Sequence, residues 1–200
     1  MSTREAPVVG SEPSRREQLL ATAADLFAAR GFHGVSVAEL GRACGISGPA
    51  LYKHFASKDA MLAEILVSVS RELLTVGRER VEEAPDAAAA LRALVAWHVE
   101  FALTRRATIV LQDRDWSALP DDAREEVRRL QRSYVDTWAD QLRRLDGDLA
   151  PATARATAHA VFGLINSTPH SARLPGPEMR ALLRGMAERA LGLDAGMDVG

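Results

Sequence analysis

Apolar positions recur at helical spacing along most of the chain. Leu19, Ala23 and Phe27 are spaced four residues apart, which places them on one face of a helix. A longer apolar row from Ser57 to Glu83 predicts a helix of about six or seven turns. Further helical patterns cover residues 86–107, 121–145, 151–167 and 178–191. Because Ala and Leu dominate and β-branched runs are few, we predict an all-α protein.

Capping signals predict a helix-turn-helix between the first helix and the long one. Ser36 and Glu39 have the spacing of a capping box, in which each side chain bonds the backbone amide of the other residue. Gly45 suits the end of that helix, because glycine adopts a left-handed conformation without a Cβ clash. Ser47 caps the next helix, and Pro49 lies in its first turn, where the missing N–H breaks no hydrogen bond. The pattern predicts two short helices joined by a tight turn, and the second is short enough to enter a DNA major groove.

The charge balance alone gives little support for nucleic-acid binding. The chain has a net charge of −2, with +1 on residues 1–60 and −3 on the remainder. A nucleic-acid-binding domain is usually strongly basic. The chain has only two lysines, however, and both Lys53 and Lys58 lie in or beside the predicted helix-turn-helix. This placement is consistent with compact positive charges that meet phosphates.

The composition favours a protein of a reducing compartment. Cys44 is the single cysteine, so no intrachain disulfide forms, and its position on the inner side of the helix-turn-helix predicts a small core residue. Residues 1–14 are polar, contain two prolines and lack the apolar segment of a signal peptide. No uninterrupted run of about 18 apolar residues predicts a membrane span. We therefore expect a cytoplasmic protein.

The order of a helix, a helix-turn-helix, the motif LYKHF followed by S-K-D, and a long helix resembles the TetR family of bacterial transcriptional repressors. The similarity covers roughly residues 14–64, and L-Y-x-[HY]-F-x-S-K is its most specific part. The matching residues are Leu26, Phe27, Gly31, Val37, Ile46, Leu51, Tyr52, His54, Phe55, Ser57, Lys58 and Leu62. Cys44 replaces the small apolar residue usual at its position.

The resemblance implies a division of labour along the chain. It implies a helix-turn-helix DNA-binding domain over residues 14–60 and an all-helical ligand-binding and dimerisation domain over residues 61–193. Residues 1–13 are expected to be a disordered polar tail and residues 194–200 a frayed tail. The long helix from Ser57 connects the two domains.

The resemblance also implies which residues contact double-stranded DNA. The helix from Ser47 to Phe55 would enter the major groove, while packing and capping are the alternative roles for Tyr52 and His54. Because one copy contacts only a few base pairs, a homodimer with its two reading helices about 34–36 Å apart, or a multiple, would bind a pseudo-palindromic operator. The expected base-edge contacts are Ser47, Ala50 and Lys53, with Gly48 and Pro49 allowing close backbone approach, and the expected phosphate contacts are Tyr52, His54, Lys58, Ser36 and Arg42.

Polar and bulky aromatic residues interrupt the apolar stripes of the C-terminal helices. Buried polar groups need hydrogen-bond partners, and a bundle core with scattered polar and aromatic groups suits a ligand cavity. Core packing is the alternative for any single residue. The candidate ligand-binding residues are Trp97, His98, Phe101, Gln112, Asp113, Trp116, Tyr134, Trp138, His159, Phe162 and Asn166. No pair has H-x-x-x-H or C-x-x-C spacing, so we expect no metal site and no cofactor.

The run Ile109–Trp116, with the sequence IVLQDRDW, resembles TetR-family repressors that control lipid and acyl-CoA breakdown. The similarity implies a fatty-acyl or acyl-CoA effector, whose phosphates Arg105, Arg106 and Arg114 could meet. The last two helices, over residues 152–167 and 178–191, are expected to form the dimer surface, because the first of them is rich in alanine. Closing the monomer's own core is the alternative role for their apolar faces.

These observations favour a ligand-responsive repressor that a small-molecule effector releases from its operator. The alternative is a small-molecule-binding helical module that acts through a protein partner without binding DNA, as the nearly neutral N-terminal part would allow. We expect no enzyme, because the sequence contains no G-x-S-x-G, phosphate loop or nucleophile–base pair.

Overall fold

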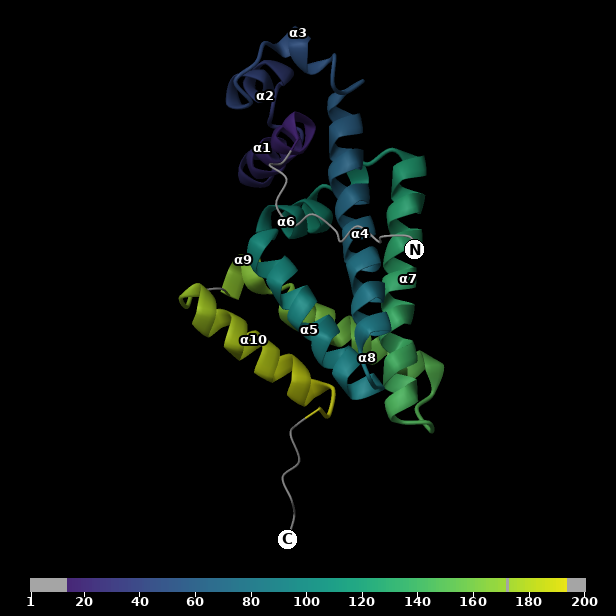
Figure 1. Ribbon diagram of the computed structural model, residues 1–200. Helices are drawn as coiled ribbons and strands as arrows, with labels where there is room; N and C mark the ends of the chain where they lie inside the picture. The colour runs from purple at the N-terminus through teal and green to yellow at the C-terminus, as the bar shows by residue number, and fades with distance from the viewer. Residues whose placement is uncertain (1–13, 172, 194–200) are drawn as a thin grey trace, which may run out of the picture.

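The computed structural model describes residues 14–171 and 173–193, and over these residues the chain is helical without strands (Figure 1). The all-α prediction is therefore confirmed. The two expected tails, 1–13 and 194–200, lie outside the described residues. The helices are α1 (Arg15–Arg30), α2 (Val37–Ala43), α3 (Gly48–Leu51), α4 (Lys58–Glu83), α5 (Ala87–Thr104), α6 (Arg106–Arg114), α7 (Asp121–Leu145), α8 (Pro151–Ile165), α9 (Thr168–Ser171) and α10 (Gly176–Ala190), with a 3-10 turn, η1, at Trp116–Ala118.

A serine N-cap stands at the beginning of each of the first four helices. Ser14 and Ser36 each form a complete capping box, the first with Glu17 and the second with Glu39. In the second box, hydrogen bonds from Ser36 hold the pKa of the Glu39 carboxyl below its usual value. Ser47 caps α3 and Ser57 caps α4 through side-chain oxygens that accept backbone amides. Each cap joins two residues three positions apart, so the beginning of each helix is determined by the local sequence.

One expected helix is divided. The pattern predicts a continuous helix over residues 86–107, but α5 ends at Thr104 and α6 begins at Arg106. Arg105 has a non-helical backbone, with φ −115° and ψ 36°. The Thr104 hydroxyl donates to the Glu100 carbonyl oxygen at 2.8 Å, a local bond that accompanies the bend. The break lets α6 turn beneath α1 instead of continuing along the bundle (Figure 1).

The N-terminal core includes residues from the C-terminal half. Phe27 and Phe32 are buried at its centre, with ring centroids 5.2 Å apart. Leu111 of α6, Leu119 after η1 and Val127 of α7 are buried in the same apolar cluster. Cys44 also belongs to this core and is 7% exposed, and burial raises the pKa of its thiol. The helix-turn-helix therefore rests on α6 and α7 as well as on its own helices.

The second core fills the C-terminal bundle around α5, which packs against α4, α7, α8 and α10. Among the described residues, α5 is the one helix whose length and apolar composition would suffice to cross a membrane. Leu91, Leu94, Val95 and Val99 of this helix are fully buried inside the bundle. Burial in a protein core thus accounts for the apolar character of α5.

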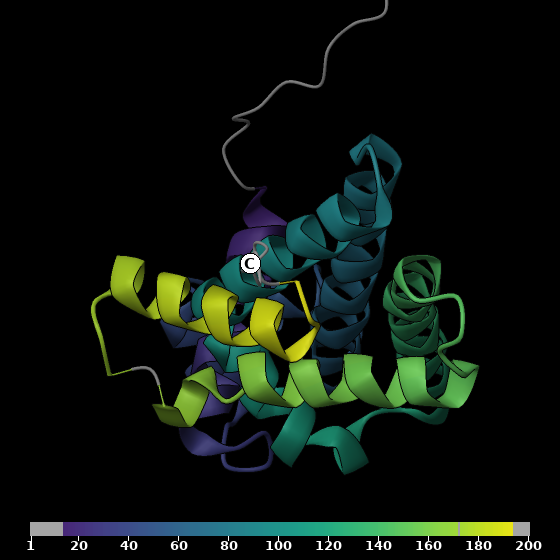
Figure 2. The ribbon, with the colours of Figure 1, turned by 90° about the horizontal axis from the view of Figure 1, so that it is seen from below.

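The helices α8 and α10 lie side by side on one face of the molecule, as Figure 2 shows from below. Leu182 and Met186 of α10 are 43% and 40% exposed on this face. Ile165 and Leu183 lie in the two segments expected to form the dimer surface, but both are buried within the protomer. The outer face of α10 therefore carries Leu182 and Met186, while its inner face packs within the protomer.

Candidate DNA-binding face and ligand cavity

The helices α2 and α3 stand at one end of the molecule, next to the start of α4 (Figure 1). They cross closely because Gly41 has no side chain: a Cβ there would lie 2.8 Å from the backbone nitrogen of Gly48 and 2.9 Å from the carbonyl oxygen of Ile46. Such distances are shorter than real Cβ contacts. Gly41 thus fixes the angle at which α3 is presented, although sequence analysis gave it no role.

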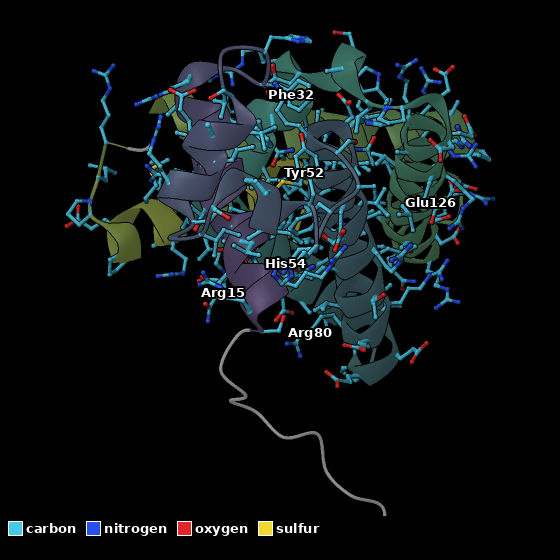
Figure 3. All side chains as sticks on the ribbon, turned by 90° about the horizontal axis from the view of Figure 1, so that it is seen from above. Arg15, Phe32, Tyr52, His54, Arg80 and Glu126 are labelled. Atoms are coloured by element: carbon cyan, nitrogen blue, oxygen red, sulfur yellow. The ribbon has the colours of Figure 1, made fainter. Side chains whose placement is uncertain are left out.

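Several expected DNA-contacting side chains lie on the outer surface of this end. Tyr52 is 55% exposed, and Lys53, His54 and Arg42 are exposed with it. Figure 3 looks onto this end of the molecule, with Tyr52 and His54 labelled. The exposure of Tyr52 leaves its aromatic ring and hydroxyl free of the core.

Ser36 and Ser47 use their hydroxyls within the fold. The Ser36 hydroxyl donates to the Glu39 carboxylate at 2.7 Å, and the Ser47 hydroxyl accepts the Ala50 amide at 3.3 Å. Pro49 and Ala50 lie in the short α3 that follows the Ser47 cap. Gly48 has ordinary packing distances, since a Cβ there would come no closer than 3.8 Å to another atom.

The structure corrects the role expected for Lys58. Its ammonium donates to the carbonyl oxygens of Phe32 at 2.9 Å and Val35 at 3.0 Å, and it lies 4.3 Å from the centroid of the Phe32 ring. These contacts fix the link between α1 and α2 against the start of α4. An ammonium engaged in this way is poorly placed to hold a phosphate, which sequence alone could not reveal because the partners come from a distant loop.

Two arginines at the start of α1 hold the helix-turn-helix in place. Arg15 donates to the carbonyl oxygen of Cys44 at 2.7 Å. Arg16 bonds the Glu64 carboxylate through Nε at 2.6 Å, donates to the His54 carbonyl oxygen, and lies 4.4 Å from the Phe55 ring centroid. The first helix is therefore connected to the ends of both helices of the motif.

A second set of contacts joins α6 to the end of α1. Arg114 donates to the carbonyl oxygens of Phe27 at 2.5 Å and Ala28 at 3.0 Å, which satisfies two acceptors in the last turn of α1. The neighbouring Asp115 is 7% exposed, accepts from Arg114, and accepts the Phe32 amide at 3.4 Å. The sequence analysis suggested that Arg114 could meet ligand phosphates, but in the structure its guanidinium is bonded to α1 and Asp115.

A cavity of about 200 Å³ lies between α4, α5, α6, α7 and α8. Eight of the candidate ligand-binding residues line it, namely His98, Phe101, Gln112, Asp113, Tyr134, His159, Phe162 and Asn166. The six further lining residues are Ser70, Leu73, Thr108, Ile109, Gln131 and Val135. Gln131 lies three residues before Tyr134 on α7, so helical spacing could have identified it.

The three tryptophans do not line this cavity. Trp138 is fully buried behind it, with its ring 5.0 Å from Phe162 at a nearly perpendicular angle. Trp97 donates from Nε1 to the Leu73 carbonyl oxygen at 3.4 Å. Trp116 packs against the N-terminal core, where the Arg128 guanidinium lies 5.6 Å from its ring centroid. The contacts of all three are those of structural residues, which matches core packing, the alternative role given to them in the sequence analysis.

His98 belongs to a cluster of three roughly parallel rings in the cavity, in which Tyr134 and Phe162 also lie 5.4 Å apart. Its imidazole is parallel to Phe162 with centroids 4.7 Å apart and nearly parallel to Tyr134 at 5.7 Å. Its ring nitrogens lie 3.3 Å from the Tyr134 hydroxyl and 3.1 Å from Asn166 Oδ1. Burial lowers the pKa of His98 to about 4 and raises the pKa of Tyr134. This part of the cavity is therefore aromatic, hydrogen-bonded and uncharged at neutral pH.

Tyr134 reaches this position because α4 has a glycine opposite it. A Cβ at Gly77 would lie 2.6 Å from Tyr134 Cε2, closer than carbon atoms approach without a shift. The same Cβ would lie 3.4 Å from a methyl of Leu94. Gly77 therefore contributes to the cavity through the space that it leaves empty.

The described residues include no candidate metal site. Within residues 14–171 and 173–193, no cluster of three His, Cys, Asp or Glu side chains is arranged to hold a metal ion. The polar groups near His98 bond each other instead.

A helix-turn-helix at one end and a lined cavity in a helical bundle at the other define the class of two-part helical regulators. Two family models match in the corresponding order: "Bacterial regulatory proteins, tetR family" over residues 19–65, and "Tetracyclin repressor-like, C-terminal domain" over residues 84–176. The chain belongs to the TetR family of bacterial regulatory proteins.

Similar proteins agree with this assignment. The HTH-type transcriptional repressor KstR2 of Rhodococcus jostii is 33% identical over 125 residues, which cover 62% of this chain and 61% of that protein. A TetR-family regulator from Bordetella parapertussis is 27% identical, with a TM-score of 0.77 and coverage of 91% of this chain and 95% of its own. AibR, solved with isovaleryl coenzyme A and operator DNA, shares the fold at 20% identity and a TM-score of 0.67, covering 86% and 97% of the two chains.

Proposed function

We propose that this protein is a transcriptional repressor that binds a pseudo-palindromic operator as a homodimer and is released by a small-molecule effector. The family assignment and the repressor KstR2 support the DNA-binding role. The complex of AibR with isovaleryl coenzyme A and operator DNA supports an acyl-CoA or similar metabolite as effector. Because a repressor binds chromosomal DNA, we place the protein in the cytoplasm. We assign it no enzymatic activity, since its relatives are transcriptional regulators.

The observation that carries the proposal is the double contact made by α6. Thr108, Ile109, Gln112 and Asp113 of this nine-residue helix line the cavity. Arg114, the next residue, bonds the last turn of α1. A ligand that moves α6 therefore moves the support of the helix-turn-helix, so that occupation of the cavity and the position of α3 are coupled.

The DNA contacts are proposed on exposure and chemistry. Tyr52, Lys53, His54 and Arg42 supply exposed donors at the end of the molecule that carries α3. Ser47, Gly48, Pro49 and Ala50 form the backbone that would face the base edges, with Ser36 at the flank. Lys58 acts in this proposal by holding the Phe32–Val35 link.

The dimer is proposed to form through α8 and α10. Leu182 and Met186 project from α10 into solvent, and Ala156, Ala160 and Gly163 of α8 give a small-residue surface beside them. Replacing Leu182 and Met186 with Glu would place two charges in such an interface. Light scattering of this double variant should give a monomer mass, whereas a dimer mass would exclude this face.

Selection of bound duplexes from a random library, followed by titration at several salt concentrations, tests the function. We expect an operator with two half-sites and a strong decrease in affinity with salt. The test variant is Lys53→Ala. Its matched control is Arg80→Ala, because Arg80 is exposed on α4 and paired with Glu83 three residues away. A protein that enriches no duplex would be a binding module that acts through another partner.

A further inference from the structure

A groove on α7 and α8 borders the cavity. It has a volume of about 410 Å³. Its lining residues are Arg128, Gln131, Arg132, Val135, Asp136, Arg155 and His159. Gln131, Val135 and His159 also line the cavity. The two spaces are therefore neighbours that share these three residues.

Three guanidinium groups line the groove, and each forms only exposed ion pairs. Arg132 lies 2.8 Å from Glu125, Arg128 lies 3.9 Å from the same carboxylate, and Arg155 pairs with Asp136 at 2.7 Å. Three cations thus share two carboxylates. The arginine side chains are 50–61% exposed. Exposed ion pairs contribute only about 0–1 kcal/mol each, so these guanidiniums can exchange a carboxylate for a ligand phosphate.

The cavity has the opposite character. Its described lining includes no Lys or Arg, and its one carboxylate belongs to Asp113. His98 is neutral because burial depresses its pKa. An anion would gain no charged partner there and would lose its hydration, which makes the cavity unsuitable for a negatively charged group.

The cavity volume also limits the ligand. A volume of about 200 Å³ is somewhat larger than the roughly 150 Å³ cavity that accepts benzene. It suits one ring or a short chain, a body of about six to ten carbon atoms. A longer chain would have to leave through the rim or enlarge the bundle.

We propose that the effector has two parts: a neutral apolar body of about six to ten carbons in the cavity, and an anionic head held by Arg128, Arg132 and Arg155. This inference rests on the proposed function, because it takes the cavity as the effector site. It replaces the arginines expected from the sequence, because Arg114 bonds the last turn of α1 and neither Arg105 nor Arg106 lines the cavity or the groove. The head carries phosphates, as in a coenzyme A thioester, or a free carboxylate, and the experiment separates these sources.

The test is calorimetric titration of the full-length protein with octanoyl-CoA, octanoate and uncharged octanamide. The test variant is Arg132→Gln with Arg155→Gln, which keeps Arg128 because its guanidinium also packs on Trp116. The matched control is Arg129→Gln with Arg144→Gln, which removes two exposed charges from α7 outside both spaces. Operator binding is measured on the same preparations.

We expect the test variant to weaken octanoyl-CoA binding by about tenfold or more and the control variant to change it by less than about twofold. Octanamide should bind all three proteins alike. An equal loss for octanoate identifies a carboxylate head, whereas a loss confined to octanoyl-CoA identifies phosphates.

Three results would overturn the inference: equal affinity of the test and control variants for both octanoyl-CoA and octanoate, an equal loss for octanamide, or no binding of either anionic compound to the unchanged protein. Intact operator binding in these cases leaves the proposed function standing. Failure to select any duplex contradicts the proposed function itself, whatever the arginines do.

Discussion

Arg114 at the end of α6 donates a hydrogen bond of 2.5 Å from Nη2 to the carbonyl oxygen of Phe27 in the last turn of α1. This bond joins a helix that lines the cavity to the helix that supports the DNA-binding motif. The same guanidinium holds Asp115, which accepts the Phe32 amide. The contacts of one side chain therefore connect the two halves of the protein.

Arg114→Ala should loosen the end of α1. Two backbone acceptors lose a charged donor, and because the Arg114 side chain is 42% exposed we expect a loss of about 1 kcal/mol in the free energy of unfolding. Hydrogen exchange of the amides in residues 27–32 should become faster. Arg106→Ala at the exposed start of α6 is the control. Unchanged exchange in Arg114→Ala would show that the α1 end does not depend on this bond.

Gly77→Ala should destabilise the bundle even though alanine favours helix. A Cβ at 2.6 Å from Tyr134 forces the ring to move, which costs about 1–3 kcal/mol, more than the propensity gain of about 1 kcal/mol. Urea unfolding measures the difference. Gly185→Ala inside α10, where a Cβ would meet only the flexible end of the Arg189 side chain at 3.3 Å, is the control and should be neutral or stabilising. A more stable Gly77→Ala protein would contradict the packing of Tyr134.

His98 should make the protein less stable in mild acid. Its pKa is about 4 in the folded state and near 6.5 when unfolded, so between these values the unfolded chain binds a proton that the folded chain excludes. Stability therefore rises with pH across this window. From pH 7 to pH 5 the His98 contribution should fall by about 2 kcal/mol.

Unfolding of the natural protein and of His98→Gln at both pH values isolates this contribution. The glutamine variant should start from a lower stability and lose less on acidification. Parallel losses would mean that His98 is not held neutral by burial.

Lys53→Ala and Lys58→Ala should have different effects on DNA binding. Lys53 is exposed beside α3, so its removal should weaken operator binding and lower the salt dependence by about one charge. Lys58 bonds two carbonyl oxygens, so its removal should lower the melting temperature while the folded protein keeps its salt dependence. A reduced salt slope in Lys58→Ala would return Lys58 to the DNA-contacting set.

Local signals made the helix starts and the helix-turn-helix predictable. Ser36 and Glu39 sit three residues apart, and their capping box depends on almost nothing else in the chain. The same holds for the Ser47 and Ser57 caps. The division at Arg105 was missed, because the apolar pattern continues across it.

Side-chain roles that depend on distant partners were not predictable. Trp138 lies on an apolar stripe and is fully buried, but a stripe does not distinguish a residue that faces a cavity from one packed behind it. Lys58 and Arg114 read as available cations in sequence, yet backbone carbonyls from another segment bind both. Gly77 carried no signal, since its effect is the space it leaves for Tyr134.

The shared core of the N-terminal part sets a condition on engineering hybrid regulators. Phe27 and Phe32 pack in one cluster with Leu111, Leu119 and Val127, which lie far beyond the helix-turn-helix in sequence. A chimera that exchanged only residues 14–60 for those of another regulator would set a foreign surface against these three side chains. Retargeting this protein to a new operator therefore requires transferring residues 111–127 together with the helix-turn-helix, or redesigning the packing between the two segments.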